Sequence, residues 1–131
     1  MSRSGEPVAR ALAVFCGGAL GALARAGLVE AWPPRPGHWP WATFAVNVAG
    51  AALVGWLASR YGGDLHGARY SLWGSGFCGA LTTFSTMQLE LFQMLENDHA
   101  ALALGYAAAS IAVGVAAVSA GSALHRRVRA S

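Results

Sequence analysis

Polar side chains that could bind an ion lie inside long apolar stretches of this sequence. Asn47 is in the middle of one stretch and Thr43 lies four residues before it, so both project from one face of a helix. Tyr106 and Ser110 have the same spacing in another stretch. Amide and hydroxyl groups donate hydrogen bonds, so these residues could either hold a small anion or join neighbouring helices.

The segment from Gly74 to Thr86 has the highest density of such groups and is a poor helix sequence. Glycines at 74, 76 and 79 precede a hydroxyl cluster around Phe84, made of Thr82, Thr83, Ser85 and Thr86. Glycine in a helix interior costs about 1 kcal/mol relative to alanine. We therefore predict an interruption near residues 82–85. A break at membrane depth frees carbonyl groups, which suit a cation such as Na⁺, and amide groups, which suit an anion.

The composition indicates a membrane protein. Of 131 residues, 55% are hydrophobic and 11% are charged, whereas a soluble domain has roughly 25% charged residues. Disordered chains are rich in charge and are excluded by the same numbers. An enzyme is not expected, because Cys16 and Cys78 each lie in apolar sequence without a neighbouring base. The four histidines are dispersed and are interpreted as solvated surface residues.

Four apolar windows are long enough to cross a bilayer, which takes roughly 20 helical residues. Only Arg25 and Glu90 are charged within them. The sequence therefore predicts an all-α integral membrane protein. Residues 1–131 form one domain of four transmembrane helices, the third of them interrupted. The predicted helices cover about residues 11–29, 41–58, 70–95 and 100–124.

The connections are short. Residues 30–40 contain four prolines, and tryptophans 32, 39 and 41 are expected to form an interfacial aromatic belt. A second interpretation of the N-terminus is a cleaved signal peptide, with Arg3 and Arg10 before an apolar stretch that ends in Ala22-Leu23-Ala24.

The distribution of arginine predicts the topology. With four spans, seven arginines lie on the side that holds both termini and two lie on the other. This bias predicts a multi-pass protein of the plasma membrane with cytoplasmic termini. The flanking arginines also account for the net charge of +3, so no nucleic-acid partner is expected. The seven are Arg3, Arg10, Arg60, Arg69, Arg126, Arg127 and Arg129; the two are Arg25 and Arg35.

Small residues one helical turn apart predict close helix packing, because helices in lipid associate through backbone contact and hydrogen bonds. A bundle of this size has little interior, so a transport path would lie at or near an interface between subunits. The pairs are Gly17 and Gly21, Ala51 and Gly55, Gly105 and Ala109, and Ala117 and Gly121.

Four motifs resemble the CrcB/Fluc family of fluoride channels. Residues 76–86 (GFCGALTTFST) are similar to the family signature. Residues 17–25 resemble its glycine-rich first helix that ends in arginine, residues 43–50 its Thr-x-x-x-Asn-x-x-Gly, and residues 88–90 the glutamate that follows the break. The resemblance extends from about residue 11 to residue 124.

The resemblance implies a fluoride-selective channel that exports F⁻ passively from the cytoplasm. It also implies an antiparallel dimer with two narrow pores and a structural Na⁺ at its centre. The backbone carbonyls of Gly79 and Thr82 would bind the Na⁺, Phe84 would line the pore, and Arg25 would lie in the vestibule. The implied polar track consists of Thr43, Asn47, Ser85, Tyr106 and Ser110.

Two positions depart from the family pattern. Met87 replaces a usual second phenylalanine, which leaves it as pore wall without a ring edge, and Gly114 stands where the polar track often continues with serine. The arginine bias favours insertion in one orientation, so the dimer partner is either a second copy or an oppositely oriented homologue. Two other functions are considered: a small proton-coupled multidrug transporter, whose carboxylate would have to be Glu90, and a structural subunit of a membrane complex.

Overall fold

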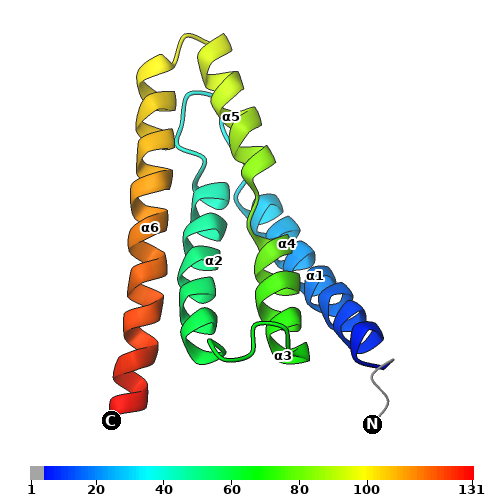
Figure 1. Ribbon diagram of the computed structural model, residues 1–131. Helices are drawn as coiled ribbons and strands as arrows, with labels where there is room; N and C mark the ends of the chain where they lie inside the picture. Colours follow the sequence, from blue (N-terminus) through cyan, green and yellow to red (C-terminus); the bar gives the residue numbers. More distant parts are fainter. Residues whose placement is uncertain (1–4) are drawn as a thin grey trace.

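Three long helices and one interrupted helix make up the computed structural model, which describes residues 5–131 (Figure 1). α1 (Gly5–Ala31), α2 (Trp41–Arg60) and α6 (Ala100–Ala130) are each long and apolar enough to cross a membrane. The remaining crossing is divided among α3 (Ala68–Tyr70), the π-helix η1 (Ser71–Cys78), α4 (Gly79–Leu81) and α5 (Phe84–Glu96). The predicted all-helical fold with an interrupted third helix is therefore confirmed, and the protein is a multi-pass membrane protein.

The helices extend further than their apolar windows. α1 begins at Gly5 rather than near residue 11, and α6 continues to Ala130 rather than ending near residue 124. The windows end where charges begin, but a helix can continue into the interfacial water with its arginines exposed. The π-helical winding of Ser71–Cys78 was not predicted, since its hydrogen-bond register leaves no pattern in the residue types. Arg3 lies outside the described residues.

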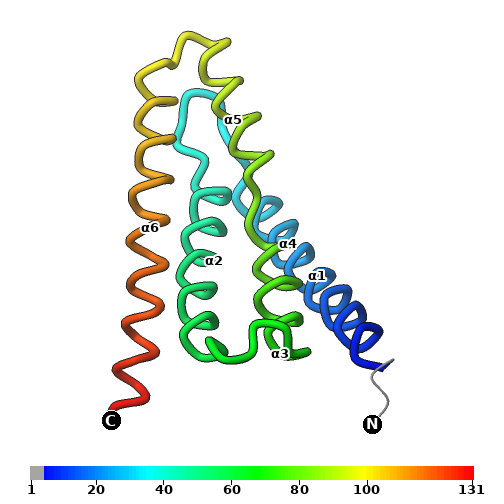
Figure 2. Tube along the Cα trace, viewed as in Figure 1, coloured from blue at the N-terminus to red at the C-terminus, as the bar shows by residue number. Residues whose placement is uncertain are grey.

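The helices pack in two layers. α2 lies along α6, whereas α1 crosses η1 and α4 (Figures 1 and 2). α5 packs against α6 at the end of the molecule away from the termini, and the proline-rich loop between α1 and α2 rises between these two helices. Because α1 packs closely against η1, it is an integral part of the bundle, which argues against the signal-peptide interpretation.

Glycines line two seams, one between α1 and η1 and one between α2 and α6. A Cβ atom on Gly17 or Gly21 would overlap the backbone carbonyl of Leu72 or Phe77, respectively, in η1. In the α2–α6 seam, added Cβ atoms on Gly55 and Gly121 would likewise overlap backbone carbonyls of the facing helix. These four glycines, which belong to three of the four predicted small-residue pairs, therefore lie at close helix contacts. Gly105 differs, because a Cβ there would have no described atom within 4 Å.

One tryptophan of the predicted belt packs inward, and one interpretation of a histidine was wrong. Trp39 is half-buried, with its ring centroid 5.4 Å from that of Tyr106 and 5.4 Å from that of Phe44. Trp32 and Trp41 are each 50% exposed, and the interfacial belt stays a prediction. His125 is buried, with 9% of its surface exposed, and is not a solvated residue. Both positions became interior because a neighbouring helix covers them, which sequence composition does not reveal.

Candidate functional site

Thr82 and Thr83 interrupt the third span. Both have extended backbone dihedrals, with ψ of 151° and 113°. The Cys78 carbonyl accepts hydrogen bonds from the Thr82 amide (3.0 Å) and from the Thr82 hydroxyl (2.8 Å), which ends α4. The Thr83 hydroxyl accepts a hydrogen bond from the Thr86 amide at 3.2 Å and caps α5. The two threonines therefore end one helix and begin the next.

The Asn47 side chain holds the break open from α2. Its Nδ2 donates to the Thr83 carbonyl at 3.1 Å, and its Oδ1 accepts from the Thr83 amide at 2.8 Å. An uninterrupted helix would instead pair the Thr83 amide with the Gly79 carbonyl. Asn47 thus replaces one helical hydrogen bond and leaves the Gly79 carbonyl without its helical donor. One Nδ2–H of Asn47 stays available for another acceptor.

A buried carboxylate lies next to this break. Glu90 in α5 is 7% exposed and accepts hydrogen bonds from the Thr43 hydroxyl (2.6 Å) and the Tyr106 hydroxyl (2.7 Å). Thr43 is 2% exposed and Tyr106 is fully buried. Glu90 therefore ties α2 and α6 to α5 through one side chain, as a buried charged group must be hydrogen-bonded.

The opposite side of the break faces outward. Phe84 is 69% exposed, and Ser85 and Gly79 are exposed beside it. The Ser85 hydroxyl lies 3.4 Å from that of Thr83. A hydroxyl and an unpaired carbonyl on a lipid-facing surface are unfavourable, so this surface is suited to contact with protein or to a hydrated path.

The remaining predicted site residues are each half-buried. Met87 is half-buried and packs against the apolar cluster formed by Met94, Ala103 and Tyr106. Ser110 is half-buried one turn beyond Tyr106, and Arg25 is half-buried near the end of α1. Thr82 is also half-buried.

Sequence reasoning missed two contributions to this site. It did not assign the Thr83 backbone as the partner of Asn47, nor Glu90 as the acceptor shared by Thr43 and Tyr106. The pairing of Asn47 with the Thr83 backbone could not be read from the sequence, because every residue type except proline has the same backbone amide and carbonyl. Glu90 did leave a signal, since it is the only carboxylate in the four apolar windows.

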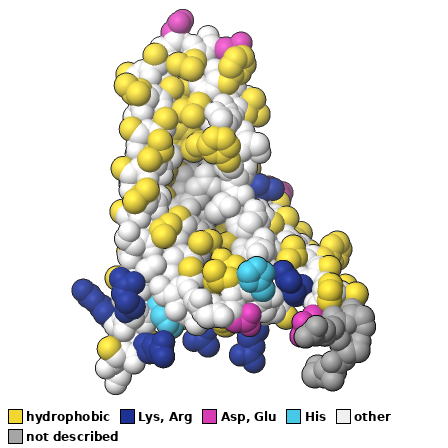
Figure 3. Space-filling model, in the orientation of Figure 1, with side chains coloured by type: hydrophobic (Ala, Val, Ile, Leu, Met, Phe, Trp, Pro, Cys, Tyr) yellow, Lys and Arg dark blue, Asp and Glu magenta, His cyan; other side chains and the backbone are white. Residues whose placement is uncertain are grey.

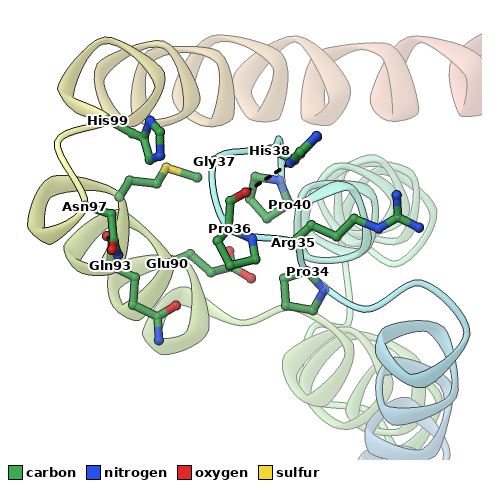
Figure 4. A pocket seen from close by; sticks show the side chains of 11 residues that line it. Pro34, Arg35, Pro36, Gly37, His38, Pro40, Glu90, Gln93, Asn97 and His99 are labelled. Atoms are coloured by element: carbon green, nitrogen blue, oxygen red, sulfur yellow. Dashed lines mark hydrogen bonds between the residues drawn. The ribbon is translucent and has the colours of Figure 1, made fainter.

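A cavity of about 320 Å³ connects Glu90 to the end of the molecule away from the termini (Figure 4). The proline-rich loop forms one wall, and residues of α5 and the α5–α6 turn, including Gln93, Asn97 and His99, form the other. Gly37 has φ of +72° and lies against the His99 ring, where a Cβ would come within 3.0 Å of Nε2. The loop therefore closes over the Glu90 end of the site.

A broken helix that displays backbone and hydroxyl groups at membrane depth is a feature of ion-conducting and transporting membrane proteins. The family model described as "CrcB-like protein, Camphor Resistance (CrcB)" matches residues 12–122. The chain belongs to this family.

Curated relatives are similar in sequence to this chain over most of their length. The chain is 53% identical over 119 residues to "Fluoride-specific ion channel FluC 1" of Mycolicibacterium paratuberculosis, covering 89% of this chain and 90% of that protein. It is 52% identical, with the same coverage, to the protein of that name in Mycobacterium bovis. It is 41% identical to "Fluoride-specific ion channel FluC 2" of Nocardia farcinica, covering 85% of this chain and 81% of that protein.

Proposed function

We propose that this chain is a fluoride-specific ion channel that lets F⁻ leave the cytoplasm passively. The observation that carries the proposal is the break in the third span, held by Asn47, with Phe84 and Ser85 displayed beside it. The identity to proteins named as fluoride channels supports it. Hydrogen fluoride crosses membranes uncharged and ionises inside the cell, so a passive exit for the anion lowers internal fluoride.

The residues around the break have the chemistry that fluoride requires. Fluoride is small and strongly hydrated, so a pore must replace its water with hydrogen-bond donors. The free Nδ2–H of Asn47 and the Ser85 hydroxyl are such donors, and Ser110 extends the polar track. Thr43 and Tyr106 belong to the same track but donate their hydroxyl hydrogens to Glu90. The positive edge of the Phe84 ring can meet the anion weakly, which allows the ion to leave again. Arg25 raises the local anion concentration from the vestibule.

The surface around Phe84 supports an antiparallel dimer with pores at or near the interface. In one chain this surface exposes the Ser85 hydroxyl, whose partner is the Thr83 hydroxyl at 3.4 Å, and the Gly79 carbonyl, which lacks its helical donor. Lipid tails offer neither group a hydrogen bond. A second subunit would cover them. The partner is either another copy or an oppositely oriented homologue, and the arginine bias favours the homologue because it orients this chain with cytoplasmic termini.

The carbonyls of Gly79 and Thr82 fit the structural Na⁺ that the family implies. The Gly79 carbonyl lacks its helical donor, and the Thr82 backbone is extended at the break. Among residues 5–131 no three His, Cys, Asp or Glu side chains converge on one point, so a resident cation would depend on backbone oxygens. When bound, Na⁺ would add positive potential near the anion path and join the broken helices of the two subunits.

Fluoride efflux from liposomes tests the proposed function. Purified protein is reconstituted in vesicles loaded with potassium fluoride, and a K⁺ ionophore clamps the potential. We expect rapid fluoride loss with chloride retained in a parallel chloride experiment. Equal loss of both anions would contradict fluoride selectivity, and flux that requires a pH gradient would indicate the proton-coupled transporter instead.

If no efflux is seen, two further experiments distinguish a missing partner chain from an obstructed pore. Co-reconstitution with an oppositely oriented homologue restores efflux if the partner is obligatory. The Met87→Phe variant restores it if Met87 obstructs the pore. Because Met87 packs against the apolar cluster that contains Tyr106, we expect the homologue to have a larger effect than the Phe variant.

A further inference from the structure

A second cavity lies at the arginine-rich end of the molecule, between the C-terminal ends of α2 and α6. Its volume is about 480 Å³. The C-terminal ends of α2 and α6 lie at the opposite end of the bundle from the α5–α6 turn (Figure 1). This cavity shares no lining residue with the cavity above Glu90, so it is separate from the site already described. Its lining residues are Trp56, Arg60, Tyr61, His125, Val128 and Arg129.

His125 and Trp56 form the aromatic wall of this cavity. The His125 side chain is 9% exposed, and its Nδ1 is buried away from the cavity surface. The Trp56 ring meets the imidazole edge-on, with centroids 5.5 Å apart and planes at 89°. The polar contacts to a ligand must therefore come from the other lining residues.

Arginines provide the charge in the same cavity. The Arg60 guanidinium lies 5.3 Å from the centroid of Trp56 and 5.5 Å from that of Tyr61, so stacking orients it. Arg129 lines the cavity from α6. No carboxylate is present among the described lining residues, which leaves a net positive site. A guanidinium presents a planar fork of N–H donors that matches the oxygens of a phosphate group.

The residues around this cavity combine positive charge with exposed apolar side chains, as expected at a membrane interface. Other arginines gather at this end of the molecule (Figure 3). Leu124 and Val128, one turn apart on α6, are 57% and 63% exposed. Lipid tails can pack on these two side chains while a headgroup reaches Arg60 and Arg129. Basic pockets at this depth recognise anionic headgroups.

We propose that this cavity binds a phosphate group, with Arg60 and Arg129 as donors and the rings of Trp56 and His125 as its wall. The phosphate comes from the headgroup of an anionic phospholipid or from free inorganic phosphate. The exposed apolar residues beside the cavity favour the lipid. The site would secure the C-terminal ends of α2 and α6 to the bilayer surface.

Native mass spectrometry of the full-length protein tests the proposal. The protein is titrated with dioleoyl phosphatidylglycerol, with zwitterionic dioleoyl phosphatidylcholine, and with phosphatidylglycerol in the presence of inorganic phosphate. We expect phosphatidylglycerol to be retained more strongly than phosphatidylcholine. Competition by millimolar inorganic phosphate would identify free phosphate as the ligand, and its absence would identify the lipid.

Matched variants locate the binding. Arg129→Gln and Arg60→Gln should each weaken phosphatidylglycerol binding about fivefold. His125→Phe keeps an aromatic edge against Trp56 and should have a smaller effect. Arg127→Gln removes the same charge from an exposed position that does not line the cavity, and it should leave binding unchanged. Equal retention of both lipids, or an equal loss in Arg127→Gln and Arg129→Gln, would overturn the proposal. Lipid binding is measured independently of fluoride efflux, so each proposal can fail alone.

Discussion

The two helix seams and the polar centre hold the bundle together by opposite means. In the α1–η1 and α2–α6 seams the backbones meet because Gly17, Gly21, Gly55 and Gly121 have no side chain. At the break, contact depends on side-chain atoms, with Asn47 bonded to the Thr83 backbone. The seams therefore tolerate no added atom, whereas the centre tolerates no lost one.

This difference separates stability from function within one small chain. The seams join rigid helices and contain little hydrogen-bonding chemistry besides the bond from Ser122 to the Gly55 carbonyl at 3.0 Å. The polar centre concentrates donors and acceptors that an ion can use. Substitutions in the seams should change folding, and substitutions at the centre should change transport as well.

The largest effect is expected for Gly121→Val. The new Cβ would overlap the Ala52 carbonyl, and backbone cannot move aside as a flexible side chain can. Overpacking costs about 1–3 kcal/mol and occasionally more, and we expect the upper end or loss of folded protein. Thermal unfolding in detergent and the yield of monodisperse protein measure the change.

Gly27→Ala provides the control for the seam. Its Cβ would meet nothing described within 4 Å, and alanine favours helix over glycine by about 1 kcal/mol. We expect unchanged or slightly raised stability. Equal losses in Gly27→Ala and Gly121→Val would show that the seam contacts do not decide stability.

Asn47→Ala should have the next largest effect. It leaves the Thr83 amide and carbonyl without partners, and each unsatisfied buried group costs about 1–3 kcal/mol. Losing one donor to the anion should also slow efflux roughly tenfold or more. Asn97→Ala is the control, because Asn97 is exposed and bonds only within its own turn, to the Gln93 carbonyl at 2.7 Å. Normal efflux from Asn47→Ala liposomes would contradict a role for the amide in the pore.

The seams could be predicted from sequence more completely than the centre. Spacing places Gly17 and Gly21 on one face, and in lipid such a face has few other uses. Spacing likewise places Thr43 and Asn47 together, and Asn47 reaches the break at Thr83 while Thr43 reaches Glu90 after it. Their partners could not be predicted, because a backbone amide and a glutamate in another span become neighbours only through the packing of three helices. Spacing alone can also mislead: Gly105 lies one turn from Ala109, but a Cβ on Gly105 would meet no described atom within 4 Å in this chain.

A double-mutant cycle on Tyr106 and Glu90 tests the centre at smaller scale. Tyr106→Phe removes the 2.7 Å hydrogen bond to Glu90 and keeps the ring. A hydrogen bond to a charged group contributes about 1.5–3 kcal/mol, so Tyr106→Phe should lower the free energy of unfolding by that amount. In the double variant with Glu90→Gln, the loss of stability should be smaller than the sum of the two single losses, because both substitutions act on the same hydrogen bond. Additive losses would show that the two side chains act independently.

The smallest effect is expected for Trp39→Phe, at the border between the centre and the surface. The Trp39 ring packs edge-on against Tyr106, but its Nε1 is buried without a partner among the described residues. Phenylalanine loses part of the packing area and removes the unpaired donor, so the two changes offset and unfolding should shift by less than about 1 kcal/mol. Trp41→Phe, at a position that is 50% exposed, is the control for lost ring area alone. A cost above about 2 kcal/mol for Trp39→Phe would mean that the indole N–H has a bound partner in the membrane. Trp39 packs on Tyr106 and so borders the polar track. If fluoride then stabilises the wild-type protein against unfolding but does not stabilise the Trp39→Phe variant, the anion is that partner.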